Sequence, residues 1–127
     1  MASILNVDTI SGKTTAGSIS ITGEGNSTTT NLQQGLLKAW AETNDDGLVL
    51  KDSLNVSGLV DTGTGQQTCN YSNSFASANN SVVTTGQAVG TNNTFASSNI
   101  SSWIVYSFNG SSYIDMAQAT MAAGDLA

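Results

Sequence analysis

Apolar and polar residues alternate over short stretches of this chain, which is the pattern of half-buried β-strands. Residues 53–57 and 66–71 both alternate, and the Asp- and Gly-rich residues 61–65 between them are typical of a turn. We therefore expect a β-hairpin here. The alternation places Leu54 and Val56 on one face of the first strand, and Gln67, Cys69 and Tyr71 on one face of the second.

A second hairpin is predicted near the C-terminus. Residues 101–108 are rich in β-branched and aromatic side chains, and residues 113–117 are a shorter apolar stretch. Asn109-Gly110 lies between them and is a preferred pair for a type I′ turn, in which both central residues have positive φ. Because Trp103 adjoins Ile104 and Val105, we expect both faces of the first strand to be buried, as in a core or at a trimer interface.

Further short strands are expected at residues 37–41 and 48–50, with the turn Asn44-Asp45-Asp46-Gly47 between them, and around Val82-Val83 and Phe95. The chain has no proline and few strong helix formers. Together these features predict an all-β fold, a compact antiparallel β-sandwich or barrel-like domain over residues 36–127.

Residues 1–35 are predicted to form a separate N-terminal arm. No aromatic residue precedes Trp40, so this segment cannot build a strong core alone. Residues 4–10 and 18–22 can be extended, residues 23–31 are linker-like, and residues 31–37 fit a helical turn or the entrance to a strand. The arm is a floppy tail or, in the interpretation we favour, becomes ordered by swapping onto neighbouring subunits that cover its apolar side chains.

Composition and charge exclude several functions. Of 127 residues, 60 are Ser, Thr, Asn or Gly, and the formal charge is −6, from three lysines against nine acids. Without clustered basic residues we expect neither nucleic-acid binding nor attraction to an acidic membrane surface. No apolar run is long enough to span a membrane, so no membrane insertion is expected, and no signal peptide is visible. The one cysteine, Cys69, is expected to be a small buried residue on a strand.

The search for catalytic chemistry gives no candidate site. A nucleophilic serine needs a base, and the chain has no histidine. We interpret the carboxylates that glycoside cleavage would require as solvated turn acids, namely Glu24, Glu42, Asp45, Asp46, Asp52 and Asp61. The turn at residues 44–47 hints at a calcium loop but lacks the spaced ligands. We predict no catalytic residue, no cofactor-binding residue and no metal ligand.

Three ordered blocks resemble a family of small virion structural proteins of tailed marine bacteriophages. The first is Leu5-Asn6-Val7-Asp8-Thr9-Ile10 with residues 13–17, and the second runs from residues 33–40 through 52–57 and 61–65 to 67–71. The third is Gly124-Asp125-Leu126-Ala127. Gln66-Gln67 departs from the acidic-aromatic pair more usual in the family, and residues 86–112 match nothing in it.

The resemblance implies a non-enzymatic virion protein, made in the host cytoplasm and assembled as a homotrimer. The leading hypothesis is a small tail-fibre or appendage component, involved in assembly or host adhesion. It would contact other virion proteins of the tail or capsid through the N-terminal arm, and a host-surface glycan through exposed loops at residues 84–100. The alternatives are a capsid decoration or head-fibre knob protein and, less favoured, a glycan-degrading tailspike-type enzyme.

Candidate interface residues are apolar side chains of the arm, of residues 36–40 and of the expected strand at residues 101–108. They are Leu5, Val7, Ile10, Leu36, Leu37, Trp40, Trp103 and Val105. For Trp40 and Trp103 we also consider sugar stacking on an exposed ring, but we favour core or interface packing for both.

Overall fold

The computed structural model describes residues 4–13, 19–23, 29–86 and 93–127, and the chain divides into two compact units, Met1–Gly35 and Leu36–Ala127. In the first unit, β1 (Ser20–Thr22) pairs antiparallel with β2 (Thr29–Asn31), and α1 (Leu32–Gly35) follows as one helical turn. Of the two alternatives for residues 31–37, the structure therefore shows the helical turn. Residues 4–13 form neither a helix nor a strand, and their large apolar side chains are exposed.

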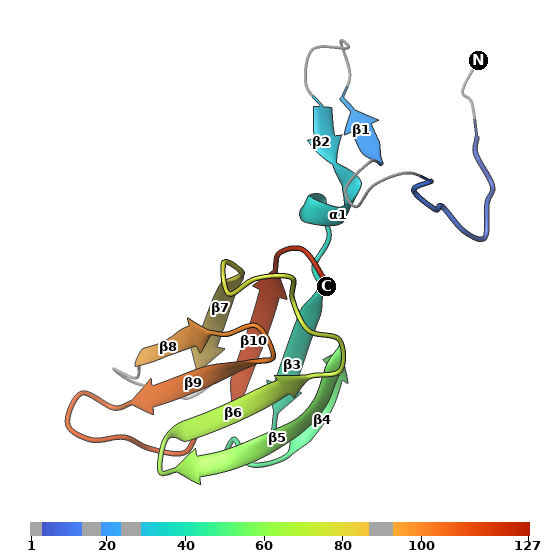
Figure 1. The fold of residues 1–127 in the computed structure, drawn as a ribbon. Helices are drawn as coiled ribbons and strands as arrows, with labels where there is room; N and C mark the ends of the chain where they lie inside the picture. The colour runs from blue at the N-terminus through green and yellow to red at the C-terminus, as the bar shows by residue number, and fades with distance from the viewer. Residues whose placement is uncertain (1–3, 14–18, 24–28, 87–92) are drawn as a thin grey trace. The chain divides into compact units, whose positions relative to one another are not determined.

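The second unit is an antiparallel β-sandwich of two four-stranded sheets, as the sequence predicts (Figure 1). The strand orders are β4-β3-β10-β7 in the first sheet and β5-β6-β9-β8 in the second. The strands of the first sheet are β3 (Ala39–Thr43), β4 (Leu50–Leu54), β7 (Ser81–Gly86) and β10 (Gln118–Ala123). The strands of the second sheet are β5 (Val56–Gly63), β6 (Gln66–Tyr71), β8 (Asn93–Ser98) and β9 (Ser102–Phe108).

Two of the expected hairpins are present. β3 and β4 pair antiparallel around the turn at residues 44–47, and β5 and β6 pair around Thr64. β5 extends to Gly63, into the segment expected to be a turn. Gly65 has φ +67°, and a Cβ there would lie 2.6 Å from the Ser107 carbonyl oxygen, so both the backbone conformation and the space require glycine.

The alternating segment at residues 53–57 is not one strand, which corrects the sequence prediction. Asn55 has φ +56°, and its Oδ1 accepts a hydrogen bond of 2.7 Å from the Asn73 N–H. The left-handed conformation turns the chain at this point from the first sheet into the second. Leu54 therefore ends on the outer face of β4, whereas Val56 packs against the core from β5.

The C-terminal hairpin prediction is wrong. β9 is a central strand with β6 on one side and β8 on the other, so the returning chain can pair only with its end beyond Tyr106, where the Ile114 N–H donates to the Ser107 carbonyl oxygen at 3.1 Å. Tyr113 makes only an isolated bridge to Phe108, after which the chain crosses to the first sheet as β10. Asn55 is the one non-glycine residue with positive φ in the described chain, so Asn109 does not form a type I′ turn. Its Oδ1 instead accepts hydrogen bonds from the N–H groups of Ser111 and Ser112, at 3.0 and 2.9 Å.

An aromatic cluster fills one end of the core. The ring centroids of Tyr71 and Trp103 are 5.0 Å apart, and those of Tyr71 and Phe75 are 4.7 Å apart. Trp103 and Val105 are 0% exposed within this single chain, which confirms the core interpretation of Trp103. Their assignment to a subunit interface is wrong, because no part of either side chain is left for a partner to contact.

The other end of the core is polar. Gln118 Nε2 donates hydrogen bonds to Gln67 Oε1 and to Ser107 Oγ, the latter at 2.7 Å, and all three residues are buried. The Gln118 N–H donates to Thr43 Oγ1 at 2.9 Å. This network links the strands β6 and β9 of the second sheet with β10 and β3 of the first.

We predict that Gln118→Ala lowers the free energy of unfolding by about 2 kcal/mol or more, because Gln67 Oε1 and Ser107 Oγ lose their common donor in a buried setting. Equilibrium urea denaturation measures this loss. The matched control is Val60→Ala on β5, whose side chain is about half exposed, so that its truncation should cost much less. Equal losses for the two variants would contradict a stabilising role for the network.

Candidate functional site: an uncharged aromatic face

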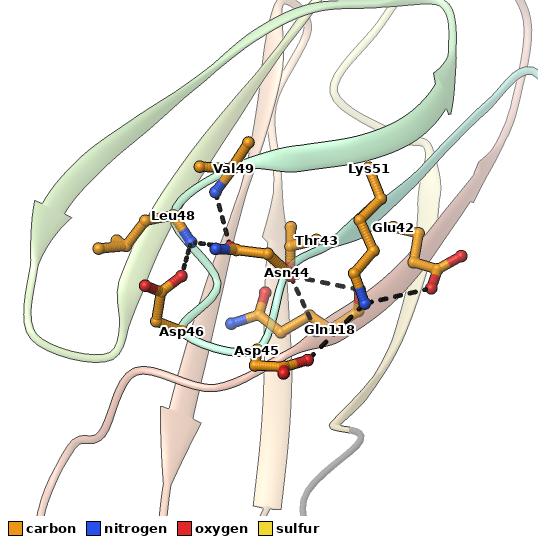
Figure 2. Close-up of polar contacts among 9 residues, drawn as sticks. All are labelled: Glu42, Thr43, Asn44, Asp45, Asp46, Leu48, Val49, Lys51 and Gln118. Atoms are coloured by element: carbon orange, nitrogen blue, oxygen red, sulfur yellow. Dashed lines mark hydrogen bonds and ion pairs between the residues drawn. The ribbon is translucent and has the colours of Figure 1, made fainter.

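The acidic turn between β3 and β4 uses its side-chain oxygens to hold its own backbone (Figure 2). Asn44 Oδ1 accepts hydrogen bonds from the N–H groups of Leu48 (2.9 Å) and Val49 (2.8 Å). Asp46 Oδ1 accepts a longer one from Leu48, at 3.3 Å. The residues that hinted at a calcium loop thus stabilise the turn itself, as Asn and Asp commonly do.

A lysine lies among the acids at this turn. Figure 2 shows the Lys51 ammonium between two carboxylates, with Nζ 3.7 Å from Asp45 Oδ1 and 3.9 Å from Glu42 Oε1. Asp115 lines the same shallow hollow. Within the described part of the chain, no group of three or more Cys, Asp or Glu side chains is placed to hold a metal ion. These exposed ion pairs are weak, and the arrangement offers no desolvated acid for general acid–base chemistry.

Cys69 lies on the inner face of β6, and its thiol is buried, as expected. Burial raises the pKa of the Cys69 thiol to about 12, an effect that the neighbouring Trp103 indole partly offsets. The pKa of the Tyr71 hydroxyl is likewise raised to about 12, chiefly by burial and further by Cys69. The thiol is therefore protonated at neutral pH and has no nucleophilic thiolate to offer.

The strongest candidate site is a cluster of aromatic rings on the outer face of the second sheet. Along β9 the side chains of Trp103, Val105 and Ser107 are buried, so Tyr106 and Phe108 lie on the opposite, outer face. Phe95 of β8 is in register with Tyr106, and the two rings stack with centroids 4.8 Å apart and planes 11° from parallel.

Tyr113 completes this group, which we call the aromatic face: Phe95, Tyr106, Phe108 and Tyr113. The Tyr113 ring is 5.7 Å from Phe108 and 6.4 Å from Tyr106, and the backbone bridge to Phe108 holds it there. Phe95 is 49% exposed and Tyr113 is 43% exposed. Half of the eight aromatic residues of the chain thus lie on one outer surface, where they add little to the core.

The strands around the aromatic face are polar but uncharged, and the carboxylate of Asp115, two residues after Tyr113, accepts a hydrogen bond from the Gly65 N–H. Strands β6, β8 and β9 contain no Asp, Glu, Lys or Arg. Gln66 is in register with Tyr106, and Asn93 with Phe108, so amide groups flank the rings. The other strands of the sandwich differ, because β5 carries Asp61 and the first sheet carries Glu42, Lys51 and Asp52. Ring faces beside amides suit a ligand that has apolar patches and hydroxyl groups but no charge.

The residues singled out from the sequence do not form one site. Leu5, Val7 and Ile10 are exposed in the first unit, and Leu36 and Leu37 are exposed where the second unit begins. Trp40 lies on the outer face of β3, in the sheet opposite the aromatic face. Trp103 is fully buried, so its ring has no exposed surface on which a sugar could stack. Of the loops expected at residues 84–100, residues 87–92 lie outside the described part of the chain.

The sequence analysis does not predict the aromatic face, because it expects both faces of the strand that became β9 to be buried. The signal available in the sequence was Tyr106 and Phe108, two residues apart, on the opposite face from Trp103 and Val105. The pairing of Phe95 with Tyr106 depends on the register of β8 against β9, which the alternation does not determine.

Comparisons with protein-family models, with curated proteins and with solved structures give no match to this chain. The described residues include no helix long and apolar enough to cross a membrane.

We predict that stability falls as pH rises from about 9 towards 12. The folded-state pKa values of Cys69 and Tyr71 are raised above their ordinary values of 9.0 and 10.0. The unfolded chain therefore releases these protons first, and their contribution to stability is complete below pH 9 and is lost as pH rises through this window. Urea midpoints at pH 8 and pH 11 measure the effect. Cys69→Ala should show a smaller decrease between the two, and an unchanged decrease would contradict the assignment to Cys69.

Proposed function

We propose that this protein is a non-enzymatic structural and adhesion component of a bacteriophage virion, and that its aromatic face binds a glycan of the host surface. The observation that carries the proposal is the exposed aromatic face, which lies mainly on strands β8 and β9 beside β6, none of which contains a charged residue. The three ordered sequence blocks that resemble small phage virion proteins support the virion location.

Sugar recognition follows from the chemistry of the aromatic face. The C–H groups of a pyranose ring form an apolar patch that stacks on an aromatic ring, and the hydroxyl groups at its edge bond to amides and hydroxyls. Phe95 and Tyr113 present accessible rings, and Gln66 and Asn93 provide amides beside them. The absence of charge in β6, β8 and β9 favours a neutral glycan over an acidic one.

The first unit supports a role in attachment. Ile4, Leu5, Val7 and Ile10 are each more than half exposed, and an apolar segment of this kind is stabilised when a partner covers it. In the proposal this arm contacts other virion proteins, and the protein assembles as a homotrimer. We place it in a tail fibre or appendage, with capsid decoration as the alternative attachment.

The acidic residues support a role without catalysis. Asp45 and Glu42 are paired with Lys51, Asp46 and Asp61 accept backbone hydrogen bonds in turns, and Asp115 Oδ1 accepts one of 2.6 Å from the Gly65 N–H. Each of these five acids thus contacts a backbone N–H or Lys51, and no two of them form a buried pair of the kind that glycoside hydrolysis uses.

The glycan proposal predicts that Phe95→Ala and Tyr113→Ala each weaken sugar binding by about tenfold, since one lost stacking contact is worth roughly 1 kcal/mol or more. An array of neutral and acidic bacterial surface oligosaccharides identifies a ligand, and isothermal titration measures the affinities. Val83→Ala, on the opposite sheet, is the matched control and should bind like the wild type. Wild-type protein that binds no oligosaccharide, or variants that bind with full affinity, would overturn the proposal.

The virion proposal predicts that an antibody against this protein labels intact phage particles. Electron microscopy of labelled particles distinguishes tail from capsid attachment. In a parallel assay, purified protein should release no reducing sugar from host polysaccharide. Unlabelled particles would argue against the virion location, and sugar release would establish the tailspike-type enzyme instead.

A further inference from the structure

The outer face of the first sheet carries a second exposed surface, which differs from the aromatic face. Trp40 is in register with Leu54 of β4 and with Met121 of β10, and Met121 is in register with Val83 of β7. Each of the four strands thus contributes one large apolar side chain to a single row across the sheet. We call these four residues the apolar row.

The apolar row is uncovered in this chain. Leu54 is 48% exposed, Met121 is 51% exposed and Val83 is 67% exposed. An open groove of about 300 Å³ runs beside the row and is lined by Leu37, Trp40, Glu42 and Met121 among others. With strands about 4.8 Å apart, the row is roughly 14 Å long. A continuous apolar strip of this length on an otherwise polar surface is typical of an interaction site.

Charged residues flank the apolar row with opposite signs. Along β3 the side chains of Ala39, Ala41 and Thr43 are buried, so Trp40 and Glu42 lie on the outer face. The Lys38 N–H continues the ladder with a hydrogen bond to the Ala122 carbonyl oxygen, and the same alternation puts Lys38 on the outer face. Lys38 therefore lies on one side of the row, and Glu42 with its register partner Asp52 lies on the other. Lys51 pairs with Glu42 and Asp45 on that second side, which stays net negative because it holds three acids against one lysine.

This pattern is complementary to itself under rotation. If copies of the sheet are arranged around an axis that runs along the apolar row, the rows meet at the axis. The Lys38 side of each copy then faces the Glu42 side of the next. An axis that runs along the strands would instead bring Glu42 towards Glu42. The charges thus select both the partner, a second copy of this chain, and the direction of the axis.

We propose that the outer face of the first sheet is a self-association surface. In the assembly the apolar rows of neighbouring copies pack together, and Lys38 of one copy pairs with Glu42 of the next. The arrangement fits the proposed homotrimer but does not depend on glycan binding, which uses the opposite sheet. It leaves the aromatic face of every copy turned away from the axis.

The first test is a substitution in the centre of the row. Met121→Asp should convert the wild-type assembly to a monomer, measured by size-exclusion chromatography with light scattering at 1 to 100 µM. Val60→Asp is the matched control, because Val60 is 47% exposed on β5 of the other sheet, and it should keep the wild-type mass. Circular dichroism melting curves verify that both variants fold.

The second test reverses the charges. Lys38→Glu alone and Glu42→Lys alone should each raise the dissociation constant of the assembly severalfold, because each places like charges together. The double variant should regain most of the lost affinity. Monomeric wild-type protein, an unchanged mass for Met121→Asp, equal losses for Met121→Asp and Val60→Asp, or no recovery in the double variant would each overturn the proposal. Glycan binding by the wild type and by Met121→Asp, measured separately, distinguishes failure of this proposal from failure of the proposed function.

Discussion

The packing of Trp103 between the two sheets is the contact on which the domain depends. The buried apolar cluster around it includes three alanines and a cysteine, so most of its apolar area comes from Trp103, Tyr71 and Phe75. Burial of apolar area is the main favourable term in folding, and here partly buried aliphatic side chains such as Leu50, Leu59 and Val82 add to it at the margin of the cluster. Trp103 and Tyr71 lie on β9 and β6, the two central strands of the second sheet. The side chains on the outer face of the same strands do not contribute to this core and can contact a ligand.

The polar end of the core determines how the loops leave the sandwich. Gln118 joins Gln67, Ser107 and Thr43, which ties β10 to the start of β6 and to the ends of β9 and β3. The β3–β4 turn packs against this end so closely that a Cβ on Gly47 would meet the Met116 carbonyl oxygen at 2.5 Å. Hydrogen bonds have directional requirements that apolar contacts lack, so this end fixes the positions of the acidic turn and of the crossing to β10.

Local patterns predicted the fold class and many strands, because alternation and turn residues act over a few positions. The buried face of β6, with Gln67, Cys69 and Tyr71, was predicted correctly for this reason. The prediction of a C-terminal hairpin failed because β9 pairs with β6 and β8. Which strands pair with a given strand depends on the whole sheet and not on the residues next to it in sequence. The break at Asn55 was not predicted, because the alternation continues on both sides of Asn55 although the chain changes sheet there. The aromatic face required both the direction of Tyr106 and the β8–β9 register, and only the first was readable from the sequence.

The two outer faces differ because the core uses only one residue of each alternating pair. On β9 the inward positions hold Trp103 and Val105, which leaves Tyr106 and Phe108 outside, while on β3 the inward alanines leave Lys38, Trp40 and Glu42 outside. The small inward residues of β3, Ala39 and Ala41, belong to the same buried cluster as the large Trp103. The core thus takes its large tryptophan from the second sheet, whereas the tryptophan of β3 lies on the outer face. An assembly that forms through the outer face of the first sheet leaves the aromatic face of the second sheet free. Subunit association and ligand binding therefore need not compete for the same surface.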